Sequence, residues 1–173
     1  MKFTATLFAT AAIVASVAAD YAAVQSDVGK IQTDVAKLYQ ALKTTSGTSY
    51  SEALAIDSAS KALVKDINTA NSDAQAVDAV TDSQAQALIS VLSNTYTNVS
   101  AASQRLIELE PSFKKLGVAG IAKTDVNNVA SATQTFGATL VSKTPSGSKA
   151  SASSLASQYN AALASAVAAY TSD

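Results

Sequence analysis

The sequence contains no cysteine, no histidine and no tryptophan, and it has only one methionine and two prolines among 173 residues. Without Cys and His, the common transition-metal sites, thiol chemistry and imidazole-activated nucleophiles are excluded. The chain also lacks a GxGxxG motif, a phosphate loop and a GxSxG motif. We therefore expect no catalytic residues, no metal site and no cofactor, and a protein that is not an enzyme.

Charged residues are scarce, since 12 basic and 13 acidic side chains give a net charge of −1. Nucleic acids and anionic membranes are bound by clustered Lys and Arg, so we expect neither as a partner. Paired carboxylates remain a chemical option, but the acidic residues are scattered among Lys, Ser and Gln. We interpret them as the solvated faces of helices: Asp27, Asp34, Asp57, Asp66, Asp73 and Asp78.

The N-terminus reads as a secretory signal peptide. One lysine precedes an apolar run from Phe3 to Val17, and small residues then suit cleavage before Asp20. We therefore expect a signal peptide over residues 1–19 and one domain over residues 20–173. No other segment is apolar enough for a membrane span, and the end AVAAYTSD lacks the tail of a lipid-anchor signal. These features predict a secreted, extracellular product.

Nearly all of the domain shows the apolar periodicity of helices. From Tyr21 to Leu42 the apolar residues recur at steps of three and four, and DVGKIQT is followed in register by DVAKLYQ. Similar stripes follow in four more segments, and none shows the period of two that strands require. We predict an all-α fold, a single-domain antiparallel bundle of about five amphipathic helices. The seven-residue repeat also fits a self-paired coiled coil, but it lasts only about three repeats, so we expect a monomer.

Helix boundaries are marked by caps and breakers. Ser49 with Glu52, and Thr81 with Gln84, have the form of capping boxes. The third helix is expected to run from Asp82 toward Pro111, with a kink near NTYTNVS, and Thr124 is expected to cap the fourth. The Ser-rich segments 44–51 and 142–154 read as linkers that suit O-linked sugars.

The order of these segments resembles a known family. The first helix carries V-x-K-I and V-x-x-L, the third runs through RLIELEPSFKKLG, the fourth is DVNNVASATQTFGATLVSKTP, and the end is YNAALASAVAAY. This layout resembles the fungal hydrophobic surface binding protein A and cell wall mannoprotein family. The resemblance implies a secreted five-helix bundle that binds fatty acids in a tunnel, or adsorbs to hydrophobic solids and recruits a lipolytic esterase. The alternative is a glycosylated structural or antigenic cell wall mannoprotein that binds no ligand.

An internal lipid site would be lined by the larger residues of the apolar stripes. The many alanines between them either let the helices approach closely or leave a void, and the sequence leaves both options open. Because cations are few, we expect hydroxyls and amides to hold a carboxylate head, with Tyr39, Gln134, Ser157 and Tyr159 as candidates. The expected apolar contacts are Leu38, Leu42, Leu63, Ile67, Leu88, Leu92, Phe113, Val129, Phe136, Leu140, Tyr159 and Leu163.

One triplet, Asn98-Val99-Ser100, is an acceptor sequence for N-glycosylation. At 3.6 residues per turn, Asn98 falls opposite the Leu/Tyr/Val stripe of its helix, which is the side that solvent reaches. Asn98 is therefore the predicted glycosylation site, on a face where a glycan would not disturb the core.

Overall fold

The computed structural model describes the backbone of residues 5–171 and the side chains of residues 20–171. Residues 5–171 form five helices, in the order α1 (Ala5–Thr44), α2 (Tyr50–Ala76), α3 (Asp82–Leu116), α4 (Ala119–Lys143) and α5 (Ser146–Ala169). No strand occurs within the described backbone, so the predicted all-α bundle is confirmed. The signal peptide expected over residues 1–19 lies outside the part whose side chains are described.

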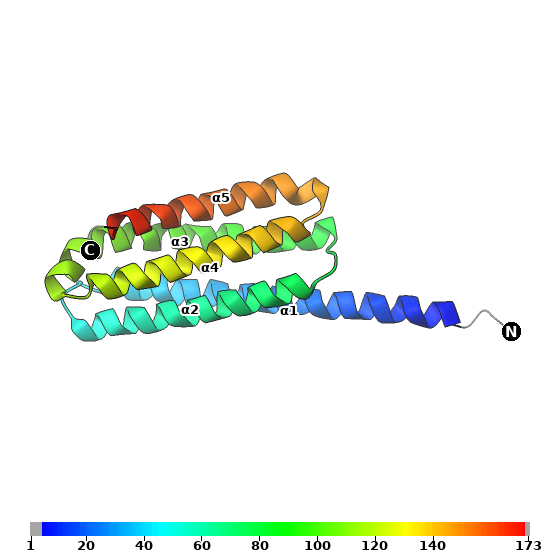
Figure 1. Cartoon of the computed structure of the whole chain (residues 1–173), viewed down its shortest axis with the longest axis horizontal. Coiled ribbons are helices and arrows are strands. Elements are labelled where there is room, and N and C mark those ends of the chain that lie inside the picture. The colour runs from blue at the N-terminus through cyan, green and yellow to red at the C-terminus, as the bar shows by residue number, and fades with distance from the viewer. Residues whose placement is uncertain (1–4, 172–173) are drawn as a thin grey trace.

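Consecutive helices run antiparallel, so that α1, α3 and α5 point one way and α2 and α4 the other (Figure 1). α1 packs on α2, α2 on α4, α4 on α5, α5 on α3, and α3 returns to α1. Each helix therefore has two main neighbours in a closed ring, and its apolar stripe faces the space inside. The stripe of α1, which carries the seven-residue repeat, is buried there from Val24 to Leu42.

The helix ends follow local side-chain chemistry. Thr81 and Gln84 form a complete capping box at the start of α3, and Gly117 ends that helix with a left-handed φ of 80°. At α2 only half of the expected box forms: Ser49 accepts from the backbone N–H of Glu52, but the Glu52 carboxylate accepts from the Thr45 hydroxyl at 2.6 Å.

Three predicted boundaries are wrong. α3 continues through Pro111 to Leu116; the carbonyl that loses its N–H partner belongs to Ile107, which is 38% exposed and can reach water. α4 begins at Ala119, so Thr124 lies inside it and donates to the carbonyl of Gly120. α5 already begins at Ser146, because its Ser and Ala residues are compatible with a helix that tertiary packing stabilises.

The interpretation of the acidic residues as solvated is wrong for Asp27, which is only 4% exposed. Its Oδ1 accepts from the ammonium of Lys30 at 2.8 Å, and its Oδ2 has no hydrogen-bond partner. The neighbouring Asp27 carboxyl group on α1 raises the pKa of Asp73 on α2.

Candidate functional site

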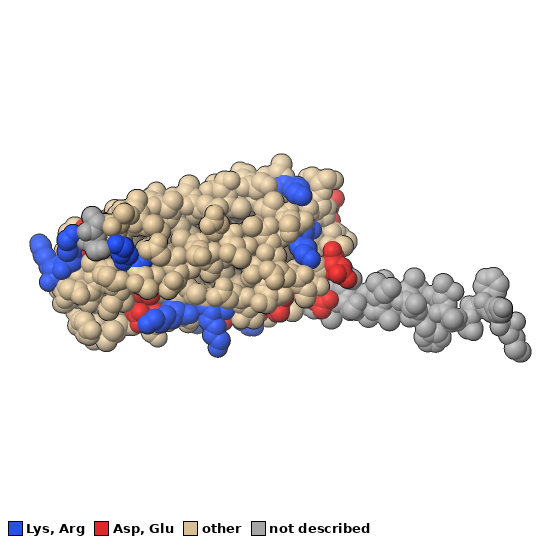
Figure 2. All heavy atoms as spheres, viewed as in Figure 1, with Lys and Arg blue, Asp and Glu red and all other residues tan. Residues whose placement is uncertain are grey.

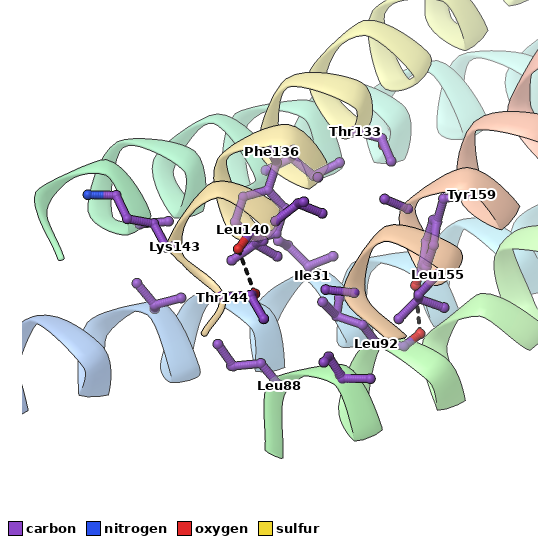
Figure 3. A pocket seen from close by; sticks show the side chains of 18 of the residues that line it. Ile31, Leu88, Leu92, Thr133, Phe136, Leu140, Lys143, Thr144, Leu155 and Tyr159 are labelled. Atoms are coloured by element: carbon purple, nitrogen blue, oxygen red, sulfur yellow. Dashed lines mark hydrogen bonds between the residues drawn. The ribbon is translucent and has the colours of Figure 1, made fainter. Parts of the chain in front are cut away.

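The interior of the ring contains a cavity of about 110 Å³. All five helices contribute to its wall, and Figure 3 shows side chains from α1, α3, α4 and α5 converging on it. The wall is almost entirely apolar. Nine of the predicted contacts line this larger cavity: Leu63, Ile67, Leu88, Leu92, Val129, Phe136, Leu140, Tyr159 and Leu163.

A smaller cavity of about 60 Å³ continues toward the other end of the bundle. Along α4, residues 129–144 line the larger cavity and residues 122–129 line the smaller one. Leu38 and Leu42 border the smaller cavity, whereas Phe113 is buried but lines neither. The interior is thus hollow along much of its length. Of the two options that the sequence left open for the alanines, close helix packing or a void, the structure shows a void.

One residue from each helix separates the two cavities. These five residues, which we call the waist, line both cavities: Val35, Leu63, Val99, Val129 and Leu163. A β-branched or Leu side chain from every helix thus narrows the interior at one level. A molecule that filled both cavities would have to pass this ring of side chains.

Most polar groups that line the larger cavity have hydrogen-bond partners in the protein. Tyr159 donates from its hydroxyl to the carbonyl oxygen of Leu92 at 2.8 Å, and its burial raises the pKa of that hydroxyl. Thr144 donates to Leu140 at 2.7 Å (Figure 3). Lys143 lines the cavity with its stem, while its ammonium points away and donates to the carbonyls of Gln75 and Val77. The larger cavity therefore offers an apolar chain no charged group.

The smaller cavity has polar side chains in its wall about one helical turn beyond the waist. Ser60 of α2, Ser103 of α3 and Asp125 of α4 all line it, and all three are buried. Asp125 is 8% exposed. Burial, followed by the charge of Asp57, raises the pKa of Asp125 to about 7. This group of three residues can donate hydrogen bonds into the cavity, from the serine hydroxyls and from a carboxyl group that stays protonated at mildly acidic pH.

The predicted head-group residues do not meet at either cavity. Gln134 and Ser157 are exposed, because each falls on the outer side of its helix, and Ser157 donates to the carbonyl of Ser153. Tyr39 is half-buried and lines neither cavity, and of the four candidates only Tyr159 does.

The sequence did not lead us to predict Ser60, Ser103 and Asp125 as site residues, because a single Ser or Asp near an apolar stripe has the pattern of a surface residue. The available signal was spacing: Asp125 is three residues after Ala122 and four before Val129, so the three share one face.

Other sites are absent or lie outside the interior. Among the described residues, no group of acidic side chains could hold a metal ion, and no helix is long and apolar enough to cross a membrane. Asn98 lies half-buried on α3. Figure 2 shows a face with few charges, which gather at the ends and along one edge of the bundle.

Comparisons with known proteins agree with this architecture. The family model "Hydrophobic surface binding protein A" matches residues 21–142. The crystal structure of AFMP4P in complex with palmitic acid has a TM-score of 0.82 at 24% identity, covering 87% of this chain and 99% of that one. Ligand binding domain 1 of the Penicillium marneffei MP1 protein, complexed with arachidonic acids, has a TM-score of 0.81 at 18% identity, with 88% and 99% covered.

Domain 2 of the same protein, complexed with multiple arachidonic acids, has a TM-score of 0.81 at 17% identity, with 88% and 96% covered. No curated protein matches the chain. The solved structures show that the fold is shared, and the family model covers most of the chain. The protein therefore belongs to the hydrophobic surface binding protein A family.

Proposed function

We propose that the protein binds a long-chain fatty acid in the interior of the bundle and acts as a carrier rather than as an enzyme. The observation that carries this proposal is the pair of collinear apolar cavities inside a closed ring of five helices. Family membership supports a role with apolar matter. Three solved structures of the same fold, one of AFMP4P and two of domains of the MP1 protein, are described in complex with palmitic or arachidonic acid.

The length of the interior suits one acyl chain. Asp125 lines the smaller cavity and Leu140 the larger one, and fifteen helical steps along α4 separate them by roughly 22 Å. An extended polypeptide backbone spans about 3.6 Å for every three covalent bonds. At the same reach per bond, the fifteen bonds of a sixteen-carbon chain span roughly 18 Å. An extended acyl chain therefore fits between these two residues.

The volumes show that binding requires some opening. A buried water needs roughly 10–15 Å³ of such space, so the larger cavity of about 110 Å³ holds roughly seven to eleven water-sized groups. The smaller cavity of about 60 Å³ holds roughly four to six. A sixteen-carbon acid therefore needs both cavities and a displacement of waist side chains.

Burial of the chain supplies enough free energy for useful affinity. At about 0.8 kcal/mol per methylene, a sixteen-carbon chain contributes on the order of 12 kcal/mol. Loss of translational and rotational freedom opposes this by at least about 4 kcal/mol, so a micromolar Kd is expected.

Native mass spectrometry of the domain secreted by a eukaryotic host tests the proposal. An adduct that leaves on mild activation with the mass of a fatty acid, or that forms on adding hexadecanoic acid, is expected. Ala156→Phe fills the larger cavity and should abolish the adduct, whereas Ala161→Phe, exposed on the same helix, should leave it unchanged. A wild-type protein that stays bare with added hexadecanoic acid overturns the proposal.

Adsorption to hydrophobic solids is a second function of the same fold that we propose. Among the described residues, the four exposed large apolar side chains lie toward one end of the bundle, near the α1–α2 loop and the α3–α4 turn: Tyr50, Leu54, Ile107 and Ile121. No disulfide ties the helices together, so we expect the bundle to open on an apolar surface and lay down its stripes. Near-ultraviolet circular dichroism should then be lost on apolar beads while helicity persists; an unchanged near-ultraviolet spectrum contradicts opening.

Secretion through the predicted signal peptide and recruitment of a lipolytic esterase belong to the same proposal. Both are supported by family membership and by the sequence pattern rather than by a contact in the molecule. A pull-down between surface-bound protein and culture supernatant, assayed for esterase activity, checks the second point.

A further inference from the structure

Three buried polar side chains face the smaller cavity at one level, about one helical turn beyond the waist. Ser60, Ser103 and Asp125 come from three different helices. They are 3%, 4% and 8% exposed. The rest of that cavity wall is aliphatic. Burying polar groups costs free energy unless hydrogen bonds compensate, and a ligand with a polar end in this cavity would supply such bonds.

Asp125 faces one other carboxyl group, that of Asp57 on α2. Asp57 forms an ion pair with Lys61, whose ammonium lies 2.7 Å from Oδ1 and 2.9 Å from Oδ2. The burial of Asp125, the charge of Asp57 and a hydrogen bond with Asp57 all favour the neutral form of Asp125, and the charge of Lys61 opposes them. Residues of α1, α3 and α5 that line this cavity are uncharged. Asp125 is therefore the group that holds the proton.

On the basis of the proposed fatty acid binding, we infer that Asp125, Ser60 and Ser103 form the head-group end of the site, and that they accept the ligand's carboxyl group while Asp125 is protonated. The neutral carboxyl of Asp125 donates a hydrogen bond to a ligand oxygen, and the serine hydroxyls donate to the remaining lone pairs. When Asp125 ionises, it loses its donor and repels a ligand carboxylate.

This orientation places the acyl chain in both cavities. With the head at Asp125, the chain crosses the waist after about one helical turn, at Val129, and then runs through the larger cavity toward Leu140. The opposite orientation places the methyl end against Ser60, Ser103 and Asp125. It would leave those three groups facing hydrocarbon, which costs free energy.

A pH-dependent affinity follows for the acid but not for a neutral amphiphile. Because the pKa of Asp125 is about 7, the competent form prevails at pH 5.5 and is a small minority at pH 8.5. Affinity for hexadecanoic acid should fall roughly 30-fold between these values, the ratio of ionised to neutral carboxyl 1.5 units above the pKa. Hexadecan-1-ol has no charge for an ionised Asp125 to repel. Its affinity should therefore fall by less than the square root of that factor, roughly 5-fold.

The experiment is a titration of the delipidated domain with hexadecanoic acid and with hexadecan-1-ol at both pH values. Asp125→Asn keeps a neutral donor at every pH, so its affinity for the acid should become nearly independent of pH. Asp78→Asn, an exposed position on the α2–α3 connection, is the matched control and should behave like the wild type.

The outcomes separate the two proposals. If both ligands bind but wild type and Asp125→Asn show the same pH dependence, the head lies elsewhere and only the carrier function stands. If the alcohol loses as much affinity as the acid, pH acts on the bundle rather than on the head. If neither ligand binds at pH 5.5, the carrier function itself fails.

A second measurement needs no variant. The ¹³C chemical shift of the carboxyl carbon of labelled hexadecanoic acid bound to the wild type should change with pH, with a midpoint near pH 7. The reason is that the ligand's carboxyl group loses its hydrogen bond from Asp125 when Asp125 ionises. A carboxyl signal identical to that of solvated fatty acid across this range would place the head in water and overturn the inference.

Discussion

The hydroxyl group of Tyr159 on α5 donates a hydrogen bond of 2.8 Å to the carbonyl oxygen of Leu92 on α3, at the wall of the larger cavity. Two other tyrosines do the same: Tyr21 of α1 donates to Gln84 at 3.3 Å, and Tyr170 donates to Leu106 at 2.8 Å. All three bonds end on carbonyls of α3. These hydrogen bonds hold α1, α5 and the C-terminal Tyr170 against α3, because side chains that border a cavity cannot position the helices by close packing alone.

Tyr159→Phe should therefore weaken the fold slightly and leave ligand binding intact. The change removes one buried hydrogen bond, worth about 1 kcal/mol, and leaves a carbonyl that still accepts its helical bond. Urea unfolding measures the first effect, and titration with hexadecanoic acid measures the second. Tyr50→Phe, exposed at the start of α2, is the control and should change neither. Complete loss of binding in Tyr159→Phe would give the hydroxyl a direct role in holding the ligand.

Arg105 closes the end of α1. Its guanidinium donates from Nε to the carbonyl of Leu42 at 3.2 Å and from Nη2 to the carbonyl of Thr45 at 3.0 Å. Because these carbonyls lie at a helix terminus, Arg105→Ala should lower the free energy of unfolding by about 2 kcal/mol. Glu108→Ala removes only the exposed ion pair at 2.9 Å and should cost less than about 1 kcal/mol. Equal costs in urea unfolding would contradict the capping role.

Gly47 occupies a position that no other residue fits. Its φ is +76°, and an added Cβ would lie 2.8 Å from the Cβ of Ser112. Gly47→Ala should therefore destabilise the protein by at least about 2 kcal/mol, from left-handed strain and a clash that the backbone must relieve. Gly29→Ala, exposed within α1 with nothing within 4 Å, should instead stabilise by up to about 1 kcal/mol. Thermal unfolding of the two variants should shift Tm in opposite directions.

The sequence predicts the bundle well because each stripe is a local pattern that has one physical solution, burial against other stripes. The full burial of Val28 and Leu42 was predictable in this way. Helix α5 was not fully predictable, since Ser and Ala between 146 and 154 have no stripe and become helical through contacts with α3 and α4.

The site was predictable only in its apolar half. Any residue of the inner stripes has a good chance of lining a central void, so Leu63, Phe136 and Leu163 were correctly placed at the interior. Whether alanines leave a void depends on differences of less than an ångström in the distance between helices, and the periodicity of the sequence does not encode such differences. The inward direction of Asp125 depends on the rotation of α4, to which one polar residue contributes little.

Stability should depend on pH through Asp125. Its pKa in the folded protein, about 7, exceeds the ordinary value of 3.8, so the folded state holds a proton that the unfolded state releases. The contribution is fully present below pH 4, declines as the pH rises, and is lost above pH 7, by up to about 4 kcal/mol in all. Asp73, whose pKa is raised by Asp27, acts in the same direction.

Asp125→Asn should flatten this profile between pH 4 and 7 and be more stable than the wild type at pH 8. Urea unfolding across that range measures both effects. A wild-type stability that rises from pH 4 to 7 with the same slope in the variant would show that Asp125 titrates as an ordinary carboxyl.

The waist makes a prediction about ligand length. Leu163→Ala removes a side chain that lines both cavities and should join them. The unliganded protein should lose about 2–5 kcal/mol of stability, the cost of enlarging a cavity. Leu109→Ala, 2% exposed and lining neither cavity, should cost a similar amount. The two variants differ in what a ligand restores: hexadecanoic acid should raise the Tm of Leu163→Ala more than that of Leu109→Ala, because the chain occupies the space that the leucine left. Acids of eighteen or twenty carbons should gain affinity relative to shorter acids only in Leu163→Ala. If both variants recover equally and keep the wild-type order of chain lengths, the acyl chain does not cross the waist.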